Sequence, residues 1–105
     1  MSLRVHYLPD HGQIKLSGKF IMEAQREFAR VYRHALPAFA DKHLVIHMGE
    51  VEYIDSSALG MLLMLHKDAK HQGTEIILKD CKPVVHKVLA MAQFDKLFAI
   101  QKYRQ

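Results

Sequence analysis

The fifteen-residue stretch Val51–Leu65, Val-Glu-Tyr-Ile-Asp-Ser-Ser-Ala-Leu-Gly-Met-Leu-Leu-Met-Leu, constrains the fold more than any other part of the chain. An apolar strand ends at one acidic residue and two hydroxyls, Asp55, Ser56 and Ser57, and an almost wholly apolar helix follows. The first backbone N–H groups of a helix lack partners within the helix, and Asp and Ser side chains accept hydrogen bonds from them. We therefore predict a strand, a capped helix start and a helix, with a hydroxyl at the helix end where a phosphate is favoured.

Strands are predicted where apolar and polar residues alternate. The alternation runs over residues 3–7 and again over 13–17, which is the period of a half-buried strand. Between them, Pro9-Asp10-His11-Gly12 has the composition of a turn, so the two strands are predicted to form a hairpin. Further strands are predicted over Leu44–Met48 and Glu75–Leu78, with a last short strand or an extended tail over Phe98–Lys102.

Helical periodicity separates these strands. Apolar residues recur at helical spacing from residue 24 to 35, where Pro37 ends the pattern, and again over 57–70. Pro83 occupies the first position of a third helix with one apolar face. Strands that alternate with helices favour parallel pairing, here with an antiparallel hairpin at the start. We predict a single α/β domain over residues 1–105, with helices packed against a mixed β-sheet of four to five strands.

Composition excludes several classes of protein. A chain of 105 residues, half apolar and one quarter charged, is typical of one globular domain. The longest apolar run, Ala58–Leu65, is far below the roughly 20 residues of a membrane-spanning helix. The first residues lack the pattern of a secretory signal, and the single Cys81 cannot form an internal disulfide. We expect a cytoplasmic protein that is not inserted in a membrane.

The net charge of +4 raises the question of nucleic-acid binding. Arg26, Arg30 and Arg33 share a predicted helix with Glu23 and Glu27, and no motif interleaves aromatic with basic residues. We therefore predict a solvated basic face and no nucleic-acid partner.

No constellation of residues indicates an enzyme. The eight histidines include no His-Glu-x-x-His pair on a helix and have no cysteine pair beside them, so no metal site is predicted. Ser56 has no base close in sequence, and the chain has no Gly-x-x-x-x-Gly-Lys-Ser/Thr phosphate loop. The sequence predicts a protein without catalytic residues, metal or cofactor.

The segment Asp55-Ser56-Ser57-Ala58-Leu59-Gly60 resembles the signature of the STAS domain, the family of the bacterial anti-sigma-factor antagonists. The usual pattern, Asp-Ser-Ser/Thr-Gly-Leu-Gly, lies between the third strand and the second helix, and Ala58 replaces its first glycine. Gly12–Phe20 resembles the family's second strand and Phe94–Ile100 its closing segment, so the resemblance covers nearly the whole chain. It implies a STAS-like domain in which Ser56, the first serine after the aspartate, is phosphorylated by a partner kinase.

The resemblance also implies how such a protein works. When Ser56 is unphosphorylated, the domain is expected to bind an anti-sigma factor or a serine protein kinase; phosphorylation breaks the complex and a phosphatase restores it. We expect a monomer or weak dimer. The residues expected to bind the partner are Asp55, Ser57, Ala58, Gly60 and Met61.

The helix of this segment is expected to divide its side chains between core and partner. Leu59, Leu62 and Leu63 are expected to face the sheet, and Met61 to be an exposed contact, because methionine adapts to varied surfaces. A glycine within a helix costs up to about 1 kcal/mol relative to alanine, so Gly60 is expected to permit close approach of a partner or of the sheet.

Two observations leave an alternative open. A helix N-cap at Asp55 or Ser56 is worth about 1 kcal/mol and is common without any signalling role. Many kinase-regulated relatives have Gly-x-Leu-Asp after the second strand, whereas this chain has Gly18-Lys19-Phe20-Ile21 and no acid before Glu23. The resemblance therefore also allows a constitutive STAS subunit of a lipid-transport ABC ATPase, which docks with the same helix and needs no phosphate.

Overall fold

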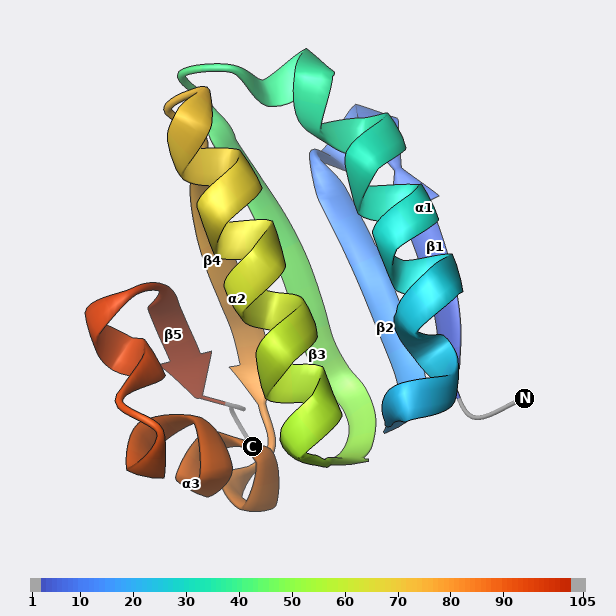
Figure 1. Cartoon of the computed structure of the whole chain (residues 1–105), viewed down its shortest axis with the longest axis vertical. Helices are drawn as coiled ribbons and strands as arrows, with labels where there is room; N and C mark the ends of the chain where they lie inside the picture. The colour runs from blue at the N-terminus through green and yellow to red at the C-terminus, as the bar shows by residue number, and fades with distance from the viewer. Residues whose placement is uncertain (1–2, 103–105) are drawn as a thin grey trace.

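The structure, a computed structural model, describes residues 3–102, so both ends of the predicted domain 1–105 extend beyond the described residues. Its regular elements are β1 (Leu3–Leu8), β2 (Gln13–Phe20), α1 (Gln25–Ala35), β3 (His43–Ile54), α2 (Ser56–His71), β4 (Glu75–Cys81), α3 (Pro83–Met91) and β5 (Ala99–Lys102) (Figure 1). Short 3-10 turns lie at Pro9–His11, Met22–Ala24, Leu36–Phe39 and Phe94–Lys96.

The five strands form one mixed sheet in the order β1-β2-β3-β4-β5. β1 pairs with β2 antiparallel, and every later pair is parallel. This confirms the predicted α/β class, the initial hairpin and the last short strand. β3 is longer than predicted because β2 pairs with it as far as Ile54, past register shifts at Lys15/Ser17 and Gly18/Lys19.

The core lies between the sheet and the two helices α1 and α2, which run side by side across one face of it (Figure 1). Phe28 and Tyr32 of α1 are almost completely buried, and so are Leu62 and Leu65 of α2. The Tyr32 hydroxyl donates a 2.6 Å hydrogen bond to the carboxylate of Asp68 and ties α1 to α2. Burial, together with this carboxylate, raises the pKa of Tyr32 to about 12.

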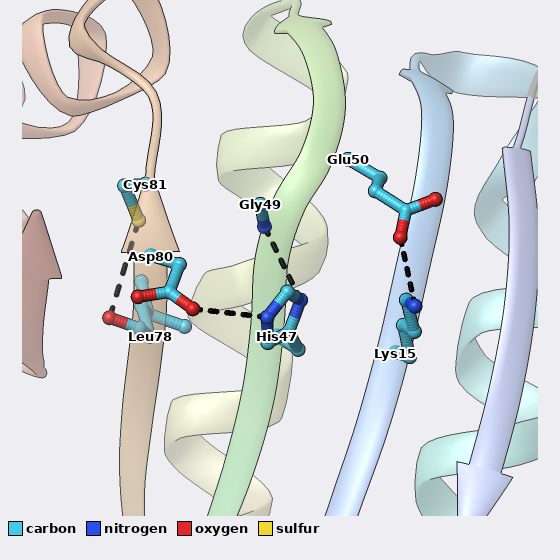
Figure 2. A network of polar contacts seen from close by, with 7 residues as sticks. All are labelled: Lys15, His47, Gly49, Glu50, Leu78, Asp80 and Cys81. Carbon is cyan, nitrogen blue, oxygen red and sulfur yellow. Dashed lines mark hydrogen bonds and ion pairs between the residues drawn. The ribbon is translucent and has the colours of Figure 1, made fainter. Parts of the chain in front are cut away.

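The other face of the sheet is polar. His6, Lys15, His47 and Lys79 lie opposite one another on four neighbouring strands. Figure 2 shows two ion pairs on this face, Lys15 Nζ to Glu50 Oε2 at 2.7 Å and His47 Nε2 to Asp80 Oδ2 at 3.0 Å.

Gly49 is the residue on which the His47–Asp80 ion pair depends sterically. Its backbone N–H donates to His47 Nδ1 at 3.4 Å, and a Cβ at this position would lie 2.8 Å from the imidazole Cε1 (Figure 2). A larger residue at Gly49 would therefore displace the imidazole. These polar contacts link β2, β3 and β4, while the buried apolar residues of the same strands, such as Leu16, Ile46 and Leu78, face α1 and α2.

Candidate partner-binding site

The site begins where β3 ends and α2 starts, and Asp55 fixes this junction. Its backbone N–H donates to the carbonyl of Phe20 at the end of β2, at 3.2 Å. Its carboxylate Oδ1 accepts the N–H of Ala58 at 2.9 Å, which is the hydrogen bond of a helix N-cap. The backbone at Asp55 is extended, with φ −106° and ψ −177°. Of the two possible caps in the sequence, Asp55 is therefore the one that the fold uses.

We expect Asp55→Ala to lower the free energy of unfolding by about 1 kcal/mol, because the N–H of Ala58 then loses its side-chain acceptor. Asp55→Asn keeps an acceptor oxygen and is expected to retain most of the stability. Urea unfolding followed by circular dichroism measures both. Equal losses for the two variants would show that the carboxylate charge, rather than the cap hydrogen bond, provides the stabilisation.

Ser56 is the first residue of α2 and is exposed, because Asp55 and not Ser56 provides the cap. The helix starts one residue earlier than predicted, so Ser56 lies within its first turn. A helix N-terminus carries a partial positive charge and unpaired N–H groups, which stabilise an added phosphate. Ser56 is thus exposed at the end of a helix that favours negative charge.

An exposed stripe continues from Ser56 along α2. Gly60, Leu63, Met64 and Lys67 are exposed and follow Ser56 at positions i+4, i+7, i+8 and i+11, which lie on one face of a helix. The side chains of Leu63 and Met64 keep 45% and 46% of their accessible surface. We call Ser56, Gly60, Leu63, Met64 and Lys67 the α2 stripe.

The rotation of α2 corrects three expectations. Met61, expected as an exposed contact, is buried with 7% of its surface accessible, and Ala58 is completely buried. Leu63, expected to face the sheet, points outward. The reason is that the completely buried residues Ala58, Leu62 and Leu65, at positions i, i+4 and i+7, face the sheet. Ser57 is half-buried, so Gly60 is the most accessible of the predicted contact residues after Ser56 itself.

Gly60 has no role in internal packing. A Cβ built at this position would meet no atom within 4 Å. The expectation that the sheet requires a glycine here is therefore wrong, and close approach of a partner remains as the prediction for Gly60.

Two exposed apolar residues near Ser56 were missed by the sequence reasoning. Tyr53 in β3 keeps 43% of its surface accessible and Met22, just after β2, keeps 62%. Tyr53 pairs with Lys19, so the ends of β2 and β3 bring these residues to the end of the sheet where α1 and α2 begin (Figure 1). Their signal in the sequence is weak, because it depends on the pairing of two distant strands.

Metal-ligating and thiol side chains were predicted to have no functional role, and the described residues 3–102 show how they are arranged. They include no group of three or more His, Cys, Asp or Glu side chains that could hold a metal ion. Burial raises the pKa of the Cys81 thiol to about 12, with a smaller contribution from Asp80, so this thiol is not a nucleophile at neutral pH. Over the same residues, no helix is long and apolar enough to cross a membrane.

A five-stranded mixed sheet with α1 and α2 on one face, in this strand order, is the fold of a STAS-type domain. The chain belongs to the STAS-domain family: the family model described as "Mlab, STAS domain" matches residues 3–101. A STAS-domain containing protein of Pseudomonas aeruginosa (strain UCBPP-PA14) is 37% identical over 87 residues, which cover 83% of this chain and 84% of the relative.

Three further similar proteins carry names of anti-sigma-factor antagonists or STAS domains. An anti-sigma F factor antagonist of Paenibacillus polymyxa is 32% identical over 59 residues, 56% of this chain and 50% of the relative. The solved structure of an anti-sigma factor antagonist from Mycobacterium paratuberculosis has a TM-score of 0.77 at 19% identity, over 99% of this chain and 87% of that chain. The structure of a STAS domain protein from Planctomyces limnophilus has a TM-score of 0.74 at 16% identity, over 98% of this chain and 91% of that chain. The two structures, both below 25% identity, establish the fold alone.

Proposed function

We propose that this protein is an anti-sigma-factor antagonist that acts in the cytoplasm by phosphorylation-controlled partner switching. With Ser56 unphosphorylated, it binds an anti-sigma factor or a serine protein kinase, and phosphorylation of Ser56 releases that partner. A phosphatase then restores binding. The observation that carries the proposal is the exposed Ser56 hydroxyl at the first residue of α2, beside an aspartate that already caps the helix.

The surroundings of Ser56 support a binding surface. Met22 and Tyr53 lie at the same end of the sheet, and the α2 stripe adds Leu63 and Met64. Exposed apolar side chains that gather in one region favour contact with a protein partner. In this proposal Gly60 lets the partner approach the helix backbone, and Asp55 holds the turn rather than contacting the partner itself.

The helix start explains how a phosphate could release the partner without unfolding the domain. Phosphorylation adds about −1.5 to −2 charges and three acceptor oxygens. In the free domain, the N-terminus of α2 and water stabilise this charge. In the complex, a partner packed on the hydroxyl would desolvate the phosphate without pairing it, which costs several kcal/mol.

Phosphopeptide mapping of the protein from its own cells, unstressed and stressed, tests the proposal. We expect phosphate on Ser56 whose occupancy changes between the two conditions. Absence of phosphate at Ser56 under every condition would refute the switch and leave the fold unaffected.

Gly60→Ala is expected to separate stability from binding. Because a Cβ at this position meets nothing, alanine should raise the free energy of unfolding by up to about 1 kcal/mol. The same methyl group should weaken binding of the partner that the wild-type protein captures from its cells. Urea unfolding and isothermal titration calorimetry measure the two effects; unchanged affinity would exclude close approach at Gly60.

One observation favours a second function, a constitutive STAS subunit of a lipid-transport ABC ATPase. β2 ends with an exposed Lys19 and a buried Phe20, and the first acid after Gly18 is Glu23 in the next 3-10 turn. The acidic residue of the Gly-x-Leu-Asp pattern of kinase-regulated relatives is thus missing from residues 18–21. In this alternative the α2 stripe docks on the ATPase and Ser56 is never modified. The constitutive subunit would be favoured over the switch if transporter genes lie beside the gene for this protein and Ser56 is never phosphorylated.

A further inference from the structure

A shallow groove of about 620 Å³ runs along the outer side of α1. Its lining is formed by three arginines, Arg26, Arg30 and Arg33, with Met22, Ala29, Gln25 and one acid, Glu23. The arginines are at positions i, i+4 and i+7, so they form one row on the helix. We call the groove that these seven residues line the α1 arginine groove.

The charges of the groove are only partly neutralised within the domain. Arg30 forms a bidentate pair with Glu27, at 2.9 Å for both hydrogen bonds, and this arginine holds the pKa of Glu27 below its ordinary value. The guanidinium of Arg33 is 4.0 Å from the carboxylate of Asp68, and its side chain is 61% exposed. Arg26 forms no ion pair with any residue of the range 3–102. Within this range Arg26 is therefore available to an external carboxylate, and Arg33, which also lies 5.6 Å from the centre of the Tyr32 ring, is held only by a long ion pair.

The groove also has an apolar component that is continuous with the surface around Ser56. Met22, exposed to 62%, belongs both to the groove and to the end of the sheet where α2 begins. Ala29 is a small, half-buried residue between the arginines. A row of guanidinium groups beside exposed methionine complements a segment with carboxylates on one side and apolar side chains on the other, because guanidinium binds carboxylate in a bidentate geometry.

We propose that the α1 arginine groove binds an acidic amphipathic helix of the partner protein, by the helix-in-groove mode. The identity of that partner rests on the proposed function, whereas the chemistry of the groove does not. Glu23, Glu27 and Asp68 lie among the arginines and repel any anion that faces them. A protein segment is favoured over an anionic membrane because its carboxylates have fixed positions and can meet the arginines without facing these acids, whereas a lipid surface presents phosphates to all of them. An acidic partner also gives phosphorylation of Ser56 a second effect, since like charges would then meet.

A synthetic peptide tests this directly. The probe is a fluorescein-labelled helical peptide with glutamates along one side and leucines beside them, and its matched control has glutamine in place of every glutamate. Fluorescence anisotropy measures binding to the full chain and to two double variants. Arg26→Glu with Arg33→Glu changes the groove, and Lys79→Glu with Lys87→Glu makes the same change of charge at exposed positions on β4 and α3. Circular dichroism and urea unfolding verify that both variants fold.

We expect the glutamate peptide to bind and the glutamine peptide not to bind. The arginine double variant should lose about tenfold or more in affinity, because it replaces two guanidinium groups that can bind the glutamates with two carboxylates that repel them. The lysine double variant should stay close to the wild type, and Arg26→Gln with Arg33→Gln should be intermediate. Three outcomes would overturn the proposal. The two charge-reversal variants could lose the same affinity, or the glutamate peptide could bind no better than the glutamine peptide. The third is arginine-dependent binding to phosphatidylglycerol vesicles instead of the peptide.

The proposal for the α1 arginine groove and the proposal for the Ser56 switch can be refuted independently. Equal partner affinity of Ser56→Asp and Ser56→Ala would reject the switch, while the peptide would still report on the groove. Conversely, if the α1 arginine groove does not bind the acidic peptide, the difference in partner affinity between Ser56→Asp and Ser56→Ala would still test the switch.

Discussion

Ser56→Asp is expected to weaken binding of the physiological partner by about 100-fold or more, because a carboxylate desolvated without a counter-charge costs several kcal/mol. The free domain should be as stable as the wild type or more stable by about 0.3–1 kcal/mol, since the added charge lies at the N-terminus of α2. The large loss of affinity is therefore expected in a protein that is fully folded.

Two further substitutions at Ser56 separate charge from size. Ser56→Ala removes the hydroxyl and should keep near-wild-type affinity, and Ser56→Asn matches the size of aspartate without its charge. Calorimetric titration with the partner identified by affinity capture gives the affinities, and urea unfolding gives the stabilities. If Ser56→Asn binds as weakly as Ser56→Asp, steric exclusion rather than charge controls the complex, and the phosphorylation mechanism is wrong.

Leu62→Ala is expected to lower the free energy of unfolding by about 2–5 kcal/mol, the cost of deleting a buried leucine side chain. Leu62 is completely buried between α2 and the sheet. A small domain has only about 5–15 kcal/mol of stability in total, so this loss is a large part of it. Thermal and urea unfolding of the variant measure the effect.

Leu63→Ala is the matched control for Leu62→Ala, because Leu63 is the next residue, has the same side chain and is 45% exposed. Leu63→Ala should change stability by no more than about 0.5 kcal/mol, as substitutions on the surface usually do. It should instead weaken partner binding several-fold, since Leu63 lies in the α2 stripe. A large loss of stability in Leu63→Ala would mean that α2 is rotated relative to the structure described here.

The fold was predictable because its signals are local. Alternation over residues 3–7 and 13–17, the turn between them and Pro83 at a helix start each depend on near neighbours in the chain. The same holds for the start of α2, where Asp55 accepts a hydrogen bond from Ala58, three residues away. The length of β3 was not predictable, because its second half is defined by pairing with β2 across register shifts.

The division of α2 between core and surface could not be obtained in the same way. Residues 58–65 are apolar on all sides, apart from Gly60, so the sequence contains no polar face from which to read the rotation of the helix. Packing against the sheet decided that Met61 is buried and Leu63 exposed. The hydrogen bond from Tyr32 to Asp68 then ties α2 to its neighbour α1 in this orientation.

The sequence by itself determined the order of strands and helices, the capped start of α2 and the position of Ser56 in that start, because hydrogen bonds and periodicity within a few residues specify them. Only the tertiary structure decided which side of α2 is exposed. It also placed Met22 and Tyr53 at the end of the sheet where Ser56 lies, and Asp68 beside Arg33. These arrangements join residues from different elements, whose relative positions follow from the burial of the whole core and from no local pattern.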